Sequence, residues 1–337
     1  MISATTTNNP NFVQRIARDH SALVIALVLI FMAVCIIGAA TAPNFLTLFN
    51  FKTIIRDAAI VGIMAIGLTF VTLSGNFFLL SMKETAALAI IAFATCMAAG
   101  LGFPMSFLIT MAIATVAGAV QGLLIGLGGN PIVVTLGAAG LFFGIGSWWS
   151  DNLVVSFRRP HGAEWLGTGS TFGLPNITIA FVIIAIVAEL VLRKTSFGRQ
   201  VYLIGANRAA GRATGHENFA MAIKVCIIAS VCSAFVAVAF SAQVSSAHVN
   251  YFSSEFGSSG DMTIMVIATV MVGGNSIMGG YGSTLRSSLG AVFISTVDNM
   301  MVLHGFNSGP RVLAVGLMIV FSIMVFALVR RGSRAEE

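Results

Sequence analysis

Residues 85–150 read TAALAIIAFATCMAAGLGFPMSFLITMAIATVAGAVQGLLIGLGGNPIVVTLGAAGLFFGIGSWWS and contain no Asp, Glu, Lys, Arg or His. Counted inclusively, this run has 66 positions, which is enough for three membrane crossings at roughly 20 residues each. The core of a soluble domain has no such run. The rest of the chain agrees, because 57% of its 337 residues are hydrophobic, 9% are charged and its mean hydropathy is +0.95. These values predict an all-α, polytopic membrane helix bundle.

Outward from this run, apolar stretches bounded by charged residues, Gly or Pro predict about ten transmembrane helices. They lie at 22–40, 58–73, 85–100, 105–127, 132–149, 177–192, 220–242, 262–272, 289–303 and 312–329. The stretch at 262–272 is too short to cross a membrane unless residues 257–260 belong to it or the helix is broken. The first stretch is longer than a usual signal-peptide core, so we expect a membrane helix there.

The distribution of Lys and Arg predicts the orientation. With the N-terminus in the cytosol and ten crossings, 13 of the 18 basic residues lie on the cytosolic side, in agreement with the positive-inside rule. These 13 are Arg15, Arg18, Lys83, Arg193, Lys194, Arg199, Arg208, Arg212, Lys224, Arg286, Arg330, Arg331 and Arg334. We therefore predict ten spans, N-in and C-in. A single transmembrane domain at 21–330, with a cytosolic loop at about 193–219, separates cytosolic tails at 1–20 and 331–337.

Several classes of function are excluded by missing motifs. The chain has no G-x-x-x-x-G-K-[ST] phosphate loop, no H-E-x-x-H, no G-x-S-x-G elbow and no Cys/His metal cluster. The four cysteines all lie in apolar stretches, as small packing residues do. The net charge of +6 comes from residues at the ends of apolar stretches, which is typical of membrane topology rather than of nucleic-acid binding. We expect no metal, no cofactor and no enzymatic activity in this chain.

Small and polar residues within the apolar stretches have two interpretations. Gly118, Gly122 and Gly126 form two G-x-x-x-G steps, and Gly140 with Gly144 forms another, which favours close helix packing. Four polar side chains are candidates for a translocation path, although helix packing or capping explains such residues more often. The four candidates are Asn76, Gln121, Asn130 and Asp298. Glu189 stands four residues before Arg193, which predicts an interfacial ion pair.

Two longer motifs carry a family resemblance. The first is KTSFGRQVYLIGAN at 194–207 with its continuation to Gly215, and the second is GGNSIMGGYGS at 273–283. Further similarity lies at 43–47, 62–75 and 130–137, so the likeness covers most of the chain in order. The chain resembles ABC-type monosaccharide permeases of the ribose, xylose and arabinose class.

The resemblance implies a bacterial inner-membrane permease that pairs with a second permease copy, identical or different. It implies two further partners, cytosolic ATPase subunits that hold ATP and Mg²⁺ and a periplasmic binding protein that delivers a monosaccharide or small polyol; lipid surrounds the chain. The expected ATPase-coupling loop contains Phe197, Gly198, Arg199, Gly205, Asn207, Arg208, Arg212 and Gly215. The expected glycine-rich cytosolic motif contains Gly273, Gly274, Ser276, Gly279, Gly280 and Gly282.

The sequence departs from the family pattern at Phe78, Leu80, Ala209 and Arg286. The resemblance therefore does not name the solute or the ATPase partner. A permease for an amino acid or another small solute would share the fold. An ion-coupled secondary carrier belongs to a different class and would depend on Asp298 as its coupling residue.

Overall fold

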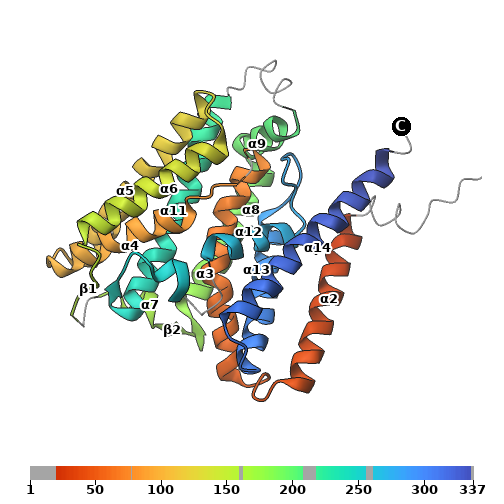
Figure 1. The fold of residues 1–337 in the computed structure, drawn as a ribbon, viewed down its shortest axis with the longest axis horizontal. Helices are drawn as coiled ribbons and strands as arrows, with labels where there is room; N and C mark the ends of the chain where they lie inside the picture. Colours follow the sequence, from red (N-terminus) through yellow and green to blue (C-terminus); the bar gives the residue numbers. More distant parts are fainter. Residues whose placement is uncertain (1–19, 77, 159–161, 208–217, 256–260, 335–337) are drawn as a thin grey trace, which may run out of the picture.

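The computed structural model describes residues 20–76, 78–158, 162–207, 218–255 and 261–334 (Figure 1). Its helices of 11 or more residues are α2 (His20–Thr41), α3 (Leu48–Leu73), α4 (Met82–Ala98), α5 (Gly102–Gly126), α6 (Pro131–Trp149), α8 (Asn176–Lys194), α9 (Ser196–Ala206), α11 (Asn218–Val244), α12 (Met262–Val272), α13 (Thr284–Leu303) and α14 (Ser308–Arg334). The short elements are α7 (Glu164–Gly167), a π-helical turn at Tyr251–Glu255, β1 (Val155–Ser156), β2 (Ser170–Thr171), β3 (Leu174–Pro175) and β4 (Ser246–Ala247).

Polar side chains fix where several helices begin. Each one accepts a hydrogen bond from a backbone N–H of the first turn, which would otherwise have no partner. These caps are Thr47 before α3, Asn130 before α6, Asp261 before α12 and Ser283 before α13. Because Asn130 caps α6 from an exposed turn, its position is explained by helix capping.

Two sets of four consecutive long helices, α3–α6 and α11–α14, have matching contacts. Helix α3, the first of the first set, packs on α13 of the second set. Helix α11, the first of the second set, packs on α5 of the first set. The shorter helix of each set follows the same rule, because α4 packs on α11 and α12 packs on α3. Within the sets, α4 contacts α5 and α6 while α12 contacts α13 and α14. The sets α3–α6 and α11–α14 therefore interlock, and each contributes one short second helix.

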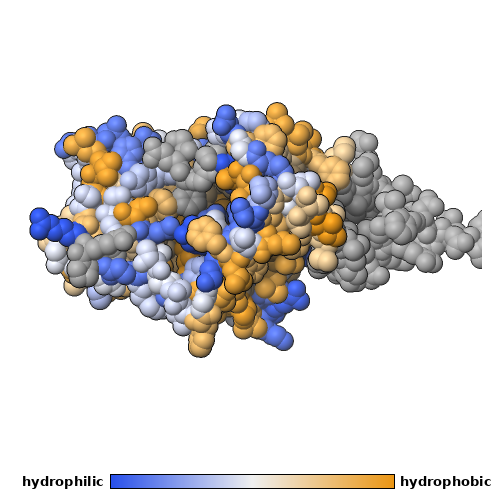
Figure 2. All heavy atoms as spheres, turned by 90° about the horizontal axis from the view of Figure 1, so that it is seen from below, coloured by the Kyte–Doolittle hydropathy of each residue, from blue (hydrophilic) through white to orange (hydrophobic). Residues whose placement is uncertain are grey.

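Burial separates central helices from peripheral ones. Within the most apolar window of each helix, 83% of residues are buried for α3 and only 28% for α6. The exposed face of α6 is apolar and includes Leu136 and Leu141, as expected for a surface that contacts lipid. Seen from the end that carries α7 and the strand pairs, polar residues predominate beneath α4 and α5, whereas hydrophobic residues gather toward α13 (Figure 2).

The glycine steps divide into two kinds. A Cβ at Gly118 would lie 2.8 Å from the Ile227 Cα, and a Cβ at Gly122 would lie 2.8 Å from the Ala222 oxygen, so α5 and α11 approach backbone to backbone. Packing by the first two G-x-x-x-G steps is confirmed. Gly140 and Gly144 meet no atom within 4 Å among the described residues, so that step makes no helix contact in this part of the chain.

Each of the ten predicted apolar stretches coincides with a helix, but their lengths differ. Among the described residues, α3, α5, α6, α8 and α11 are long and apolar enough to cross a membrane. Helix α3 begins at Leu48, ten residues before the predicted start at 58, because Lys52, Arg56 and Asp57 continue the helix that their charges were expected to end. Ten spans and the orientation of the ends stay predictions.

Candidate functional site

The corner between α8 and α9 is built by a threonine and a glycine. Thr195 caps α9, because its hydroxyl accepts a hydrogen bond from the Gly198 N–H at 3.2 Å. A Cβ on Gly198 would lie 2.5 Å from the Leu192 Cα, so only glycine lets α9 fold back this closely on α8. The Phe197 ring stacks on Phe70 of α3 with centroids 6.1 Å apart. Helix α9 is therefore fixed against both α8 and α3.

Three segments that are far apart in the sequence meet at the far end of α9. The Gly280 N–H donates to the Leu73 carbonyl at the end of α3, at 2.9 Å. A Cβ on Gly205 would lie 2.6 Å from the Gly280 nitrogen, and a Cβ on Gly279 would lie 2.8 Å from the Gly75 Cα. We call this meeting point of residues 73–75, 205–206 and 279–280 the glycine junction.

The glycine-rich segment between α12 and α13 is a folded turn rather than an open loop. Gly279 and Gly280 have φ angles of 89° and 74°, which residues with a side chain rarely adopt. The Ser276 N–H donates to the Tyr281 carbonyl at 2.9 Å and closes the turn. Asn275 supports it from within, because its Oδ1 accepts the Ser283 N–H at 2.7 Å. Gly273 permits close packing of the two helices, since a Cβ there would lie 2.5 Å from a backbone oxygen of α13.

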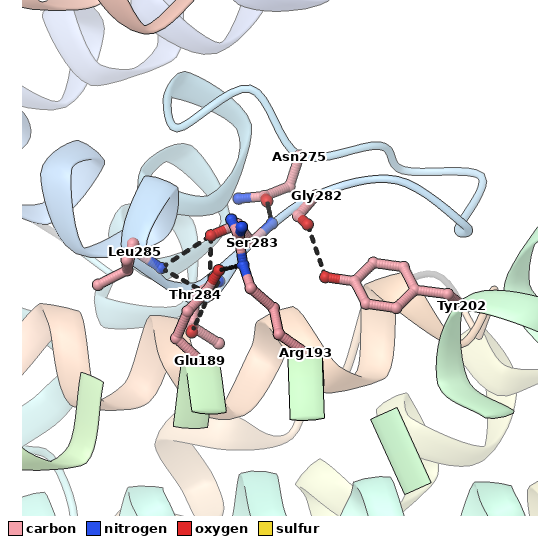
Figure 3. Close-up of polar contacts among 8 residues, drawn as sticks. All are labelled: Glu189, Arg193, Tyr202, Asn275, Gly282, Ser283, Thr284 and Leu285. Carbon is pink, nitrogen blue, oxygen red and sulfur yellow. Dashed lines mark hydrogen bonds and ion pairs between the residues drawn. The ribbon is translucent and has the colours of Figure 1, made fainter. Parts of the chain in front are cut away.

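Glu189 of α8 binds the start of α13 (Figure 3). Its Oε2 accepts the Ser283 hydroxyl at 2.8 Å, the Thr284 hydroxyl at 2.8 Å and the Thr284 N–H at 3.0 Å, with a weaker contact from the Leu285 N–H. Its Oε1 pairs with Arg193. The predicted ion pair with Arg193 is present, and the carboxylate also caps a helix 95 residues away in the sequence. Helix N-termini favour negative charge, so this contact stabilises the start of α13.

Tyr202 joins the middle of α9 to the glycine-rich turn. Its hydroxyl donates to the Gly282 carbonyl at 2.8 Å (Figure 3). Burial raises the pKa of this hydroxyl, which keeps it protonated and able to donate. This bond and the glycine junction tie α9 to α3 and to the glycine-rich turn, and Glu189 ties α8 to the start of α13.

The opposite face of α9 is exposed among the described residues. Ser196, Arg199 and Leu203 recur at helical spacing along this side, while Val201 and Ile204 are buried on the other. An amphipathic helix that is packed on its apolar side and exposes a row of polar, basic and apolar side chains on the other is suited to bind in a groove on a partner protein.

The structure gathers the residues of the two expected motifs only in part. Phe197, Gly198 and Gly205 lie at the corner and at the junction, and Gly279, Gly280 and Gly282 lie in the turn beside them. Arg199 is exposed, and Asn207 ends α9 as its C-terminal cap. Gly274 turns the chain after α12 with a φ of 76°. Arg208, Arg212 and Gly215 lie outside the described residues.

The four polar path candidates do not lie together. Gln121 accepts a hydrogen bond from Ser81, and the Asn76 side chain donates to Ser74 at 3.0 Å on the adjoining segment. Asn130 caps α6. Asp298 pairs with Arg311 through two bonds, from Nε at 2.9 Å and Nη2 at 2.5 Å, and the Arg311 side chain is 1% exposed. This buried pair joins α13 to α14.

A further ion pair, between Lys83 and Asp261, was not predicted from the sequence. The Lys83 ammonium bonds to the Asp261 carboxylate and lies 3.6 Å from Glu84. Lys83 is the second residue of α4, and Asp261 caps α12, so the pair joins the starts of the two short helices. Their separation of 178 residues left no signal in the sequence.

Comparison with known proteins identifies a family. The family described as "Branched-chain amino acid transport system / permease component" matches residues 50–328. The "Ribose import permease protein RbsC" of Bacillus subtilis (strain 168) is 28% identical and covers 86% of this chain and 88% of its own. The "Probable ABC transporter permease protein YphD" of Escherichia coli (strain K12) is 26% identical, covering 93% and 92%. The "Autoinducer 2 import system permease protein LsrC" of Enterobacter sp. (strain 638) is 27% identical, covering 87% and 83%. No solved structure matches this chain.

Proposed function

Because this chain belongs to the family of branched-chain amino acid transport system permease components, we propose that it is the membrane subunit of an ATP-driven importer for a monosaccharide or related polyol. The sugar assignment is supported by the relatives named for ribose and autoinducer 2. It is also supported by the two motifs at 194–207 and 273–283, which form one packed unit. The chain itself would carry no catalytic residue.

We propose that α9 is the element that docks with the ATPase subunit. The observation that carries this proposal is the glycine junction, where α9, the end of α3 and the glycine-rich turn pack backbone to backbone. ATP and Mg²⁺ would belong to the partner. A displacement of α9 would move α3 directly and α13 through Glu189 and Tyr202, and these helices would open a path for the solute.

The proposed orientation places α9 in the cytosol and both chain ends on the same side. Arg193, Lys194 and Arg199 at the α8–α9 corner are exposed, which supports a cytosolic position under the positive-inside rule. In Figure 1 the end of α14 and the start of α2 point toward the same end of the molecule as α9. A phosphatase that is active only in the periplasm, fused after Glu337, should stay in the cytosol and show no activity. An active fusion would overturn this orientation and the assignment to a bacterial inner membrane with ten spans.

Besides the ATPase subunit, the importer would need two further protein partners. A second permease copy, of this chain or of a different one, would complete the path, and a periplasmic binding protein would deliver the solute. Lipid would cover the apolar faces of α5, α6 and α8.

Affinity capture from gently solubilised native membranes tests the proposal. We expect an ATPase subunit to co-purify and to hydrolyse ATP in the captured complex. Leu203→Asp, on the exposed face of α9, should release that subunit. The matched control is Leu153→Asp, an exposed leucine next to β1 at the other end of the molecule, which should retain it. An ATPase-free oligomer would contradict the proposal and favour an ion-coupled carrier.

The family description supports a second candidate, import of a branched-chain amino acid. The solute retained by the co-purified binding protein distinguishes the two. A bound sugar or polyol supports the first candidate, and bound leucine, isoleucine or valine supports the second.

A further inference from the structure

The ion pair between Lys83 and Asp261 is partly buried, with 20% and 28% of the two side chains exposed, at the place where the first turns of α4 and α12 meet. Helix α12 has 11 residues, so Asp261 is about 16 Å from the end of α12 that leads into the glycine-rich turn. That is about half of a hydrocarbon core roughly 30 Å thick. On the other side of the pair, the segment from Leu73 to Met82 also starts at the glycine junction. With the glycine junction at the cytosolic face, as proposed above, both short helices would begin at a depth where charges are costly, and Lys83 would lie deeper than the cytosolic position predicted from the sequence.

The group contains more hydrogen-bonding capacity than the ion pair uses. One ammonium, on Lys83, faces two carboxylates, on Asp261 and Glu84. Among the described residues, the Glu84 Oε2 and the Thr263 Oγ1 are buried and have no hydrogen-bond partner. Such groups are normally satisfied, because an unpaired buried polar atom costs free energy. Their position beside a charged pair suits a polar ligand that supplies donors and acceptors.

Two short helices in corresponding places of two interlocked sets are typical of solute sites in membrane transporters. Here α4 and α12 are the second helices of their sets, and their first turns meet at the ion pair. We propose that Lys83, Glu84, Asp261 and Thr263 line the constriction of the translocation path and bind hydroxyl groups of the solute. The Lys83–Asp261 pair closes the path by joining α4 to α12, and it opens when the two helices part.

This inference rests on the proposed transport function and adds the place where the path closes. It also links the constriction to the docking helix, since α12 runs from Asp261 directly to the turn that contacts α9. The solute class follows from the chemistry, because neutral hydroxyls donate to carboxylates and accept from an ammonium without adding charge.

Thiol accessibility tests the inference in the full-length chain. Cys35, Cys96, Cys226 and Cys232 are first replaced by serine or alanine. Thr263→Cys then introduces one thiol and leaves all three charges in place, and Thr269→Cys is the matched control because Thr269 is 0% exposed on the same helix. A charged, membrane-impermeant methanethiosulfonate should modify the thiol at 263 about tenfold faster than the thiol at 269, since only a water-filled path admits such a reagent to this depth. Equal rates would overturn the inference.

A second set of variants tests the closing role. Lys83→Met breaks the pair and should raise the modification rate at 263 severalfold without changing the rate at 269. The charge swap Lys83→Asp with Asp261→Lys should restore the parental rate. A rate at 263 that does not respond to Lys83→Met contradicts the closing role. If Lys83→Met makes both thiols reactive, the swap decides: the parental ratio supports the pair, and equal reactivity overturns it.

Solute contact is tested with D-ribose as the probe. Excess D-ribose should slow modification at 263 and leave a thiol placed at exposed Asn130 unaffected. Equal slowing at both positions, or none at 263, overturns the hydroxyl site. These readouts need no ATPase, so they fail or succeed separately from the capture experiment, which tests the transport function itself.

Discussion

Gly205→Ala places one methyl group at the centre of the glycine junction. The added Cβ would lie 2.6 Å from the Gly280 nitrogen and closer still to the Leu73 carbonyl oxygen. Ordinary contact begins near 3.4 Å, so the glycine-rich turn must move by at least 0.8 Å, the difference between these two distances. Both neighbours are backbone atoms and cannot turn aside as a side chain would.

The expected cost has two parts. Overpacking a tight contact costs about 1–3 kcal/mol. Separating Gly280 from Leu73 also breaks their backbone hydrogen bond, which adds about 1 kcal/mol. We therefore expect Gly205→Ala to lower the free energy of unfolding by about 2–4 kcal/mol and to weaken the connection between α9 and α3.

Thermal unfolding of the purified protein in detergent measures the first effect, and ATP hydrolysis by the captured complex measures the second. Gly140→Ala is the matched control, because no described atom lies within 4 Å of the Cβ it adds and alanine favours a helix. Gly205→Ala should unfold at a clearly lower temperature than Gly140→Ala and should lose solute-stimulated ATP hydrolysis. Equal unfolding temperatures would refute the close approach.

Four further substitutions test the polar contacts. Glu189→Gln should cost about 1–2 kcal/mol of unfolding free energy, because neutral bonds replace charge-assisted ones at the start of α13. Arg193→Gln should cost less than about 0.5 kcal/mol, since the Arg193 side chain is 65% exposed, and a larger loss here than at Glu189 would reverse the assignment. Tyr202→Phe removes one hydrogen bond and should cost about 1 kcal/mol by the same unfolding measurement; no change would deny the bond a role. Arg311→Met should cost about 3–5 kcal/mol, because Asp298 loses its guanidinium partner, and adding Asp298→Asn should recover part of that loss.

The sequence was sufficient to locate the membrane helices, because each of them contains an apolar stretch that can be read directly from the residues. It failed where charge does not end a helix. The charges of Lys52, Arg56 and Asp57 predicted a helix boundary, yet these residues lie within α3, which begins at Leu48 after its cap Thr47. The exact length of α12 was read correctly, since Asp261 and Gly273 bound it on both sides.

The site was harder to predict, because it depends on contacts between distant segments. The family resemblance pointed to Gly205 and Gly280, but nothing in the sequence showed that both pack on the end of α3. The ion pair of Glu189 with Arg193 follows from helical spacing, whereas its bonds to Ser283 and Thr284 depend on how α8 and α13 pack. Arg311 lies between the predicted apolar stretches 289–303 and 312–329, yet the structure places it in α14, buried against Asp298.

The most direct test of the central claim is site-specific photocrosslinking from the exposed face of α9. A photoreactive phenylalanine analogue is placed at Leu203 in native membranes, with the same analogue at Leu153 as control. The account predicts that position 203 crosslinks to an ATP-hydrolysing subunit and that position 153 does not. Crosslinks from position 203 to lipid alone, or the same partners from both positions, would contradict the account.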